Sequence, residues 1–365
     1  MIRIDIIAGA RPNFMKIAPI ISAIELEKQK GTAIDFRLIH TGQHYDQKMS
    51  GDFFEQLGIP APDVNLEVGS GTQAEQTAKI MMGYEALLLE SPSNLCLVVG
   101  DVTSTMACAI AAKKLNIDVA HVEAGIRSGD RSMPEEINRM VTDSITDYFF
   151  TTSEVANTNL KNAGVADNSV FFVGNTMIDT LLKQMPNFKQ PDFWEEAKLT
   201  AQNYFVLTLH RPSNVDADTQ LQQLLSEIMQ HTQGHKVVFP VHPRTAKMLA
   251  QLSMDFENLY LTEPMSYLAF NYLVKHAKAV ITDSGGITEE TTVMQIPCIT
   301  LRSSTERPET CSIGTNELIG TDPAAIKPTL EKLFAGNWKK GGIPPLWDGH
   351  TAERIVAAIK SIYAI

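Results

Sequence analysis

Short apolar runs that alternate with helical stretches constrain the fold of this chain more than any other feature. The runs have the length of buried strands, and residues such as Met106, Ile110 and Leu115 between them have helical spacing. Strands that alternate with helices favour βαβ units, whose parallel sheets carry helices on both faces. The runs form two series: Ile4–Ala8, Asp35–Ile39, Leu95–Val99, Asp118–Val122, Tyr148–Thr151 and Val170–Val173, then Tyr204–Leu209, Lys236–Pro240, Leu259–Thr262, Ala279–Thr282 and Cys298–Leu301.

The two series predict two domains. A chain of 365 residues can build two cores, and the Pro-, Asn- and charge-rich segment Leu181–Lys198 separates the series. We therefore expect one domain at residues 1–178 and another at 179–349, with a final helix in residues 350–365 that packs on the first. The predicted fold class is α/β: two Rossmann-like, doubly wound parallel-sheet domains with an inter-domain cleft.

Composition narrows the possible partners. The net charge of −11, without a run of basic residues, argues against nucleic acid and acidic membrane surfaces. No apolar stretch approaches the roughly 20 residues of a membrane span. Met1–Ala8 resembles a strand interrupted by charges rather than a signal peptide. The cysteines lack Cys-x-x-Cys spacing, so we expect reduced thiols and a cytoplasmic location: Cys96, Cys108, Cys298 and Cys311.

The segment Thr282–Glu290 indicates what the second domain binds. It follows an apolar run, and Gly285 and Gly286 precede a predicted helix. Such a helix start presents free N–H groups and a positive dipole end, which suit a phosphate. Glu290 could then accept hydrogen bonds from the vicinal hydroxyls of a ribose. The combination suggests a nucleotide, whereas the glycines alone are equally typical of an ordinary tight turn.

Polar residues follow the carboxyl ends of predicted strands in both series. Ligands of open α/β sheets bind outside these ends. We therefore expect these residues to outline the floor of the cleft: Arg11, His44, Asp101 and Glu123 in the first domain, and His210 and Ser284 in the second.

Two of these carboxylates are candidate acid–base groups. Asp101 directly precedes a predicted helix, where an aspartate also serves as an N-cap. Glu123 ends an apolar strand before Ala124-Gly125, where it is neither a cap nor part of a solvated face. Partial desolvation at such a position suits a carboxylate for proton transfer.

A third carboxylate and an imidazole complete the set. Glu135 lies in the first turn of a helix that begins at Pro134, where acids also favour the helix dipole. Arg139, four residues later, is expected to pair with Glu135 or to hold an anion. His210 and Arg211 end a strand, where a histidine is either structural or in contact with a ligand.

The sequence has no metal-ligand spacing, no Walker motif, no Gly-x-Ser-x-Gly elbow and no Gly-x-Gly-x-x-Gly after a strand. The residues therefore predict acid–base chemistry on a nucleotide-linked, hydroxyl-rich substrate, with neither metal nor cofactor. They do not by themselves name the reaction.

The order and spacing of these motifs resemble the non-hydrolysing UDP-N-acetylglucosamine 2-epimerases over almost the whole chain. The motifs that carry the resemblance are Gly9–Lys16, Thr41–His44, Gly100-Asp101, His121–Arg127, Pro134–Arg139, Gly174–Thr176, His210-Arg211, Thr282–Glu290 and Thr305–Glu309.

This resemblance implies a glycosyltransferase-B-type architecture, a homodimer and a UDP-sugar substrate. It implies interconversion of UDP-GlcNAc and UDP-ManNAc through loss of the C2 proton and anti elimination of UDP, which leaves a bound 2-acetamidoglucal. The implied site residues are catalytic Asp101, Glu123, Glu135 and His210, Arg11 and Phe270 near the uridine, Ser284, Gly285 and Gly286 on the diphosphate, Glu290 on the ribose, and Lys16 and Arg307 at further substrate positions.

The chain departs from the family pattern at four positions. Asn13 replaces a common Glu, as in relatives that act on other UDP-2-acetamido sugars, and Met265 replaces a Gln near the uracil. Pro212 replaces an Arg, and Gly71 replaces a Gln linked to activation by a second UDP-GlcNAc. The last two changes question that allosteric site, although Gln43, His44 and Glu136 remain.

Other functions stay open at this point. The same chemistry could act on a UDP-2,3-diacetamido uronate or a 6-deoxy sugar. A UDP-sugar glycosyltransferase would explain Ser284–Glu290 but not the many acid–base groups. For a non-catalytic binder, the same buried ionisable groups would be a needless cost. A hydrolysing relative would release free N-acetylmannosamine and UDP.

Overall fold

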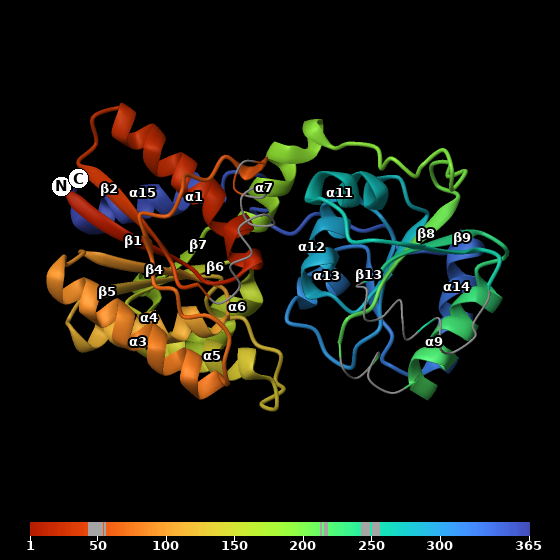
Figure 1. Ribbon diagram of the computed structural model, residues 1–365, viewed down its shortest axis with the longest axis horizontal. Coiled ribbons are helices and arrows are strands. Elements are labelled where there is room, and N and C mark those ends of the chain that lie inside the picture. Colours follow the sequence, from red (N-terminus) through yellow and green to blue (C-terminus); the bar gives the residue numbers. More distant parts are fainter. Residues whose placement is uncertain (43–53, 55, 212–213, 215–217, 242–248, 250–255) are drawn as a thin grey trace. The chain divides into compact units, whose positions relative to one another are not determined.

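The structure is a computed structural model that describes residues 1–42, 54, 56–211, 214, 218–241, 249 and 256–365 (Figure 1). The chain divides into two compact units. Unit 1 comprises Met1–Thr180 and Pro345–Ile365, and unit 2 comprises Leu181–Pro344. Each unit has its own parallel sheet covered by helices, which confirms the predicted α/β class with two parallel-sheet domains.

The sheet of unit 1 has seven strands among the described residues, in the order β3-β2-β1-β4-β5-β6-β7. All paired strands are parallel. The chain winds from β1 to one edge and then returns through β4 to the other, so the winding direction reverses between β1 and β4. The strands are β1 Ile2–Ala8, β2 Ile34–His40, β3 Val64–Asn65, β4 Leu95–Val99, β5 Asp118–Val122, β6 Tyr148–Thr151 and β7 Val170–Phe172.

Helices lie on both sides of this sheet (Figure 1). α1 packs against α15 on one side, and α4 packs against α3 and α5 on the other. The helical elements are α1 Arg11–Gln29, α3 Gln73–Glu90, α4 Thr103–Lys114, α5 Pro134–Ile145, α6 Glu154–Asn162, η1 Asp167–Ser169, α7 Thr176–Gln184, which continues into unit 2, and α15 Thr351–Tyr363.

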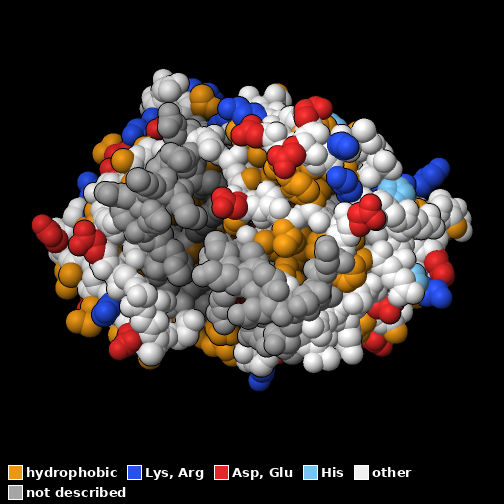
Figure 2. Space-filling model, turned by 45° about the vertical axis from the view of Figure 1, so that its right-hand side comes forward, with side chains coloured by type: hydrophobic (Ala, Val, Ile, Leu, Met, Phe, Trp, Pro, Cys, Tyr) orange, Lys and Arg blue, Asp and Glu red, His pale blue; other side chains and the backbone are white. Residues whose placement is uncertain are grey.

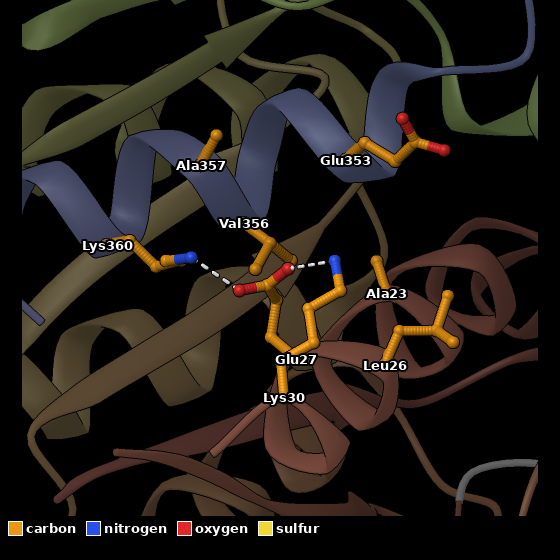
Figure 3. A pocket seen from close by; sticks show the side chains of 8 residues that line it. All are labelled: Ala23, Leu26, Glu27, Lys30, Glu353, Val356, Ala357 and Lys360. Carbon is orange, nitrogen blue, oxygen red and sulfur yellow. Dashed lines mark hydrogen bonds and ion pairs between the residues drawn. The ribbon is translucent and has the colours of Figure 1, made fainter. Parts of the chain in front are cut away.

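The C-terminal helix α15 and α1 together line a pocket of about 290 Å³ (Figure 3). At its centre the Glu27 carboxylate accepts hydrogen bonds from Lys30 Nζ, at 2.7 Å, and from Lys360 Nζ. These bonds lower the pKa of Glu27 to about 2. The side chains of Lys30 and Lys360 converge on Glu27, whereas Glu353 points away from it.

The sheet of unit 2 has six strands among the described residues, in the order β10-β9-β8-β11-β12-β13. Alternate residues of β8 enter different cores: Phe205 and Leu207 join one cluster, and Tyr204 and Val206 join another. The strands are β8 Tyr204–Thr208, β9 Lys236–Pro240, β10 Leu259–Thr262, β11 Ala279–Thr282, β12 Cys298–Thr300 and β13 Asn316–Leu318.

The segment that we expected to connect the domains, Leu181–Lys198, belongs to unit 2 from its first residue. Trp194 packs edge-on against Tyr204, with ring centroids 5.5 Å apart. The helical elements of unit 2 are η2 Met185–Asn187, α9 Asp218–His231, α11 Tyr267–Lys275, α12 Gly285–Met294, α13 Pro308–Ser312, η3 Pro323–Ala325 and α14 Ile326–Phe334.

Acidic and basic side chains are interspersed on the face shown in Figure 2. Within the described ranges, no helix combines the length and the apolar character that crossing a membrane requires.

Candidate active site

Glu123 follows β5 directly, and its side chain is buried. Its backbone φ of 71° lies in the left-handed region, which residues with a Cβ rarely adopt. The carboxylate pairs with Lys16 Nζ of α1. Gly100, after β4, makes room for this pair, because a Cβ there would lie 2.7 Å from Lys16 Nζ and 3.2 Å from Glu123 Oε2.

Asp101 pairs with Arg139 of α5, whose NH2 group lies 2.5 Å from Asp101 Oδ2. Arg139 NH1 also donates to Glu136 Oε2 at 2.7 Å. Burial raises the pKa of Glu136, but hydrogen bonds from backbone N–H groups and Arg139 outweigh it, so the pKa is lowered. Val102 is the N-cap of α4, so capping does not explain Asp101.

The acid of α5 that contacts Arg139 is Glu136, a pair that the sequence analysis did not predict. Glu135 is exposed, whereas Glu136 is buried and contacts Arg139. Residues three and four apart are both neighbours on a helix, so spacing alone could not choose between these two acids. The orientation of α5 against the sheet makes that choice.

A buried histidine links the loops that carry Asp101 and Glu123. His121 Nδ1 lies 2.7 Å from Asp143 Oδ1, and His121 Nε2 lies 2.8 Å from the Gly100 carbonyl oxygen. Asp143 Oδ2 accepts hydrogen bonds from Gly125 N–H and Arg127 NH1. Burial raises the pKa of Asp143, but His121 and Arg127 outweigh it and lower the pKa. The network therefore fixes the backbone beside both candidate carboxylates.

In unit 2, His210 lies just after β8, and Asp283 lies just after the neighbouring strand β11. His210 Nδ1 is 2.7 Å from Asp283 Oδ1. The His210 side chain is 60% exposed, whereas that of Asp283 is fully buried. The pair thus joins a buried carboxylate to an imidazole that a ligand can reach.

The N-terminus of α12 lies beside this pair in the sequence. Ser284 is its N-cap residue, and no side chain caps the helix. A Cβ at Gly286 would meet no atom within 4 Å, and one at Gly285 would come no closer than 3.6 Å to its neighbours. Packing among the described residues therefore does not require either glycine. The glycines leave the first-turn N–H groups accessible, and an anion fits there.

Glu290 lies further along α12 and is 4% exposed. Its Oε1 accepts hydrogen bonds from the Tyr267 hydroxyl at 2.9 Å and from Asn271 Nδ2 at 3.5 Å. Burial raises the pKa of Glu290 to about 7, although the hydrogen bond from Tyr267 opposes this rise. The carboxyl group therefore titrates near neutral pH.

The arginines that follow β12 are held by buried carboxylates. Arg307 Nε pairs with Glu289 of α12. Arg302 donates from both NH groups to the two oxygens of Glu306, each at 2.7 Å. Arg302 NH1 and Glu306 Oε2 each lie 3.6 Å from where a Cβ of Gly285 would be, so this ion pair borders the start of α12.

Of the other residues named in the sequence analysis, some pack against the core of unit 2 and others lie outside the described part of the structure. Phe270 of α11 and Met265 pack against a hydrophobic core cluster of unit 2. Arg11 begins α1, but its side chain lies outside the described part of the structure. Three further positions also lie outside the described residues: Gln43, His44 and Pro212.

In unit 1, Lys16 thus pairs with Glu123, and Asp101 and Glu123 follow the neighbouring strands β4 and β5. In unit 2, His210 and Ser284 lie after adjacent strands. Sequence reasoning missed Asp143, Asp283 and Tyr267. Asp283 carries a weak signal, because it directly follows an apolar strand, but its partner His210 is far away in the sequence.

No cluster of three or more His, Cys, Asp or Glu side chains suited to a metal ion occurs in the described ranges. The four cysteines are free thiols.

Comparisons with known proteins show which family the chain resembles over its length. The family model described as UDP-N-acetylglucosamine 2-epimerase matches residues 25–360. The UDP-N-acetylglucosamine 2-epimerase of Methanocaldococcus jannaschii is 40% identical over 97% of this chain and 98% of that protein. The UDP-2,3-diacetamido-2,3-dideoxy-D-glucuronate 2-epimerase of Pseudomonas aeruginosa is 39% identical over 86% of this chain and 87% of that protein.

A solved structure is also similar over the full length. The crystal structure of the M. jannaschii UDP-GlcNAc 2-epimerase in complex with UDP-GlcNAc and UDP covers 99% of this chain and 100% of its own chain, with 39% identity and a TM-score of 0.87. The chain therefore belongs to the UDP-N-acetylglucosamine 2-epimerase family and is an enzyme of the isomerase class.

Proposed function

We propose that this protein interconverts UDP-GlcNAc and UDP-ManNAc without a cofactor, through anti elimination of UDP to a 2-acetamidoglucal and re-addition of UDP. The family and a 40% identical relative named for this activity support the proposal. The single observation that carries it is the placement of Asp101 and Glu123 at the carboxyl ends of neighbouring strands β4 and β5.

The reaction requires proton transfer at both faces of the sugar C2 atom. Loss of this weakly acidic proton and departure of UDP give the glucal, and delivery of a proton to the opposite face with return of UDP gives the epimer. More than one acid–base group is therefore necessary. We assign this role jointly to Asp101, Glu123, Glu135 and His210. Lys16 and Arg139 hold charge beside Glu123 and Asp101.

The departing UDP needs donors where negative charge develops. We propose that the diphosphate binds the N–H groups of Gly285 and Gly286 and the hydroxyl of Ser284, whose own N–H donates to Thr282 Oγ1. Glu290 would accept from the ribose hydroxyls. Phe270 and Arg11 would lie near the uridine, and Arg307 would supply positive charge. The glucal and UDP would have to stay bound between elimination and re-addition, because they would otherwise diffuse apart.

A second candidate substrate is a UDP-2,3-diacetamido uronate, because a 39% identical relative is named for that sugar. The reaction and the acid–base groups would be the same. The uronate would need an additional cation near C6 of the sugar.

Proton NMR in D2O tests the proposal. With UDP-GlcNAc, we expect UDP-ManNAc that carries deuterium at C2. Free N-acetylmannosamine would instead indicate a hydrolase, and turnover of the diacetamido uronate alone would support the second candidate. An enzyme that binds UDP but leaves both sugars undeuterated would contradict epimerisation. Glu123→Gln serves as the matched inactive control.

A further inference from the structure

Asp283 is a buried carboxylate that receives an unusual number of hydrogen bonds. Its oxygens accept from His210 N–H at 3.0 and 3.2 Å, from Arg211 N–H at 3.0 Å and from Asn214 Nδ2 at 3.0 Å. His210 Nδ1 lies 2.7 Å from Oδ1. The side chain is fully buried, so these donors replace the water that the carboxylate has lost.

These donors keep Asp283 ionised. Burial raises the pKa of this carboxyl, but the hydrogen bond and the charge of His210, with those from Arg211 and Asn214, outweigh burial and lower the pKa. An ionised carboxylate can accept hydrogen bonds but cannot donate them. The nitrogen of His210 that faces Asp283 must therefore carry the proton.

The tautomer of His210 follows from this contact. When Nδ1 carries the hydrogen, a neutral imidazole has its lone pair on Nε2. The ring is 60% exposed, so the basic nitrogen is not enclosed by the protein. The Arg211 side chain, which donates to the Asp283 carbonyl oxygen at 3.1 Å, further ties this loop to the start of α12.

We propose that Asp283 is a positioning residue that holds His210 in the Nδ1–H tautomer, so that Nε2 exchanges a proton with the substrate. This inference rests on the proposed function. A proton taken up at Nε2 gives the imidazolium, whose charge the Asp283 carboxylate offsets, and its release from Nε2 restores the neutral ring. Asp283 itself stays ionised and receives no proton.

A double-mutant cycle tests whether Asp283 acts through His210. Asp283→Asn and His210→Gln should each lower kcat for UDP-GlcNAc by about 100-fold or more, since general acid–base groups contribute roughly 100- to 10,000-fold. The double variant should be no slower than His210→Gln alone, because the function of Asp283 requires the imidazole. Losses that multiply would overturn the proposal.

Asn214→Ala is the matched control. It removes another hydrogen bond to the same carboxylate but leaves the imidazole contact in place. We expect kcat within about threefold of wild type, even where the melting temperature falls, because a single truncation in a buried network costs stability. A loss of kcat as large as that of Asp283→Asn would show that the carboxylate acts by holding the loop.

Nitrogen-15 NMR of the histidine rings supplies a readout that needs no turnover. The His210 signal is assigned by its absence in His210→Gln. Wild type should show the Nδ1–H tautomer, and Asp283→Asn should shift the ring toward Nε2–H. An Nε2–H ring in wild type would overturn the inference, whether or not Asp283→Asn folds. An Nδ1–H ring in a protein that epimerises no sugar would refute the proposed function and leave the tautomer assignment intact.

Discussion

Each unit contains a histidine that contacts a buried aspartate through Nδ1, but the two pairs differ at the other ring nitrogen. His121 is fully buried, and its Nε2 contacts the Gly100 carbonyl oxygen. His210 contacts Asp283 in the same way, yet its side chain is 60% exposed. The same kind of His–Asp contact therefore serves a different purpose in each unit. Enclosure of both nitrogens makes His121 a structural link, whereas exposure of the ring makes His210 a group that can transfer protons.

The comparison extends to the carboxylates. Asp143 and Asp283 are buried, and hydrogen bonds with charged or N–H donors lower their pKa values. Glu290 is equally buried, but it receives hydrogen bonds from the neutral Tyr267 and Asn271, and its pKa rises to about 7. Burial alone does not decide the protonation state. The protonation state also depends on the hydrogen-bond donors around each carboxylate.

The largest expected effect is the loss of turnover when Glu123 or Asp101, whose loops the His121 network links, is replaced. Glu123→Gln and Asp101→Asn should each lower kcat by about 1,000-fold, because the amide cannot accept a proton in the reaction. Both variants should keep the fold, because the replacements keep the side-chain volume, but loss of the buried pair with Lys16 should lower the melting temperature of Glu123→Gln. Coupled assay of UDP-ManNAc formation and thermal unfolding measure the two quantities. Turnover near wild type in both variants would remove the site assignment.

The two histidines should contribute differently: His121 mainly to stability, and His210 mainly to activity. His121→Asn should lower the free energy of unfolding by about 3 kcal/mol, because it leaves Asp143 and Gly100 with unsatisfied buried groups. His210→Asn should cost less, about 1 kcal/mol, because Asp283 keeps the backbone N–H groups of positions 210 and 211 and Asn214 Nδ2 as donors. Urea denaturation at constant pH gives both values. Equal losses of unfolding free energy from the two substitutions would contradict the different roles of His121 and His210.

Glu290 should make stability depend on pH. Its folded-state pKa of about 7 lies above the ordinary value of 4.5, so the folded state binds more protons than the unfolded chain between these values. Its contribution is therefore present below about pH 4.5 and is lost as the pH rises through 7, by about 3 kcal/mol in total.

Glu290→Gln should abolish this part of the pH dependence, because the amide does not titrate. The difference in unfolding free energy between wild type and Glu290→Gln, measured from pH 5 to pH 8, isolates the contribution. A difference that stays constant over this range would contradict the raised pKa.

The smallest effect is expected at the pocket between α1 and α15 (Figure 3). The Glu27 carboxylate there accepts from Lys30 and Lys360, but these side chains are partly exposed to solvent. Solvent screening limits such ion pairs, so Lys360→Met should change the unfolding free energy by less than about 1 kcal/mol. A loss as large as that of His121→Asn would show that solvent exposure does not explain the difference in stability between the buried His121 network and the partly exposed Glu27 pairs.

Much of the fold was predictable because strands of a parallel sheet, buried on both faces, are continuous apolar runs. Leu95–Val99, Asp118–Val122 and Ala279–Thr282 were predicted with the bounds that the structure gives. The strands β3 and β13 were missed, because one is two residues long and the other contains Asn316 and Glu317. Neither has an apolar run to detect.

The position of a site residue was easier to predict than its partner. Asp101, Glu123 and His210 were identified because each follows a strand, a property that the local sequence carries. The contact between His210 and Asp283 depends on β8 lying beside β11, which the sequence order does not reveal. The choice of Glu136 over Glu135 by Arg139 likewise depends on how α5 rests on its unit.

The central claim of the proposed function is that Asp101 and Glu123 exchange protons with a UDP-sugar whose diphosphate binds at the start of α12. A crystal structure of the protein with bound UDP-GlcNAc tests it most directly. We expect the diphosphate oxygens to accept from Gly285 and Gly286 N–H, with the Glu123 carboxylate and His210 Nε2 within hydrogen-bond reach of the same sugar or its phosphate. A UDP-GlcNAc bound at α12 with Asp101 and Glu123 facing a separate pocket would contradict the account.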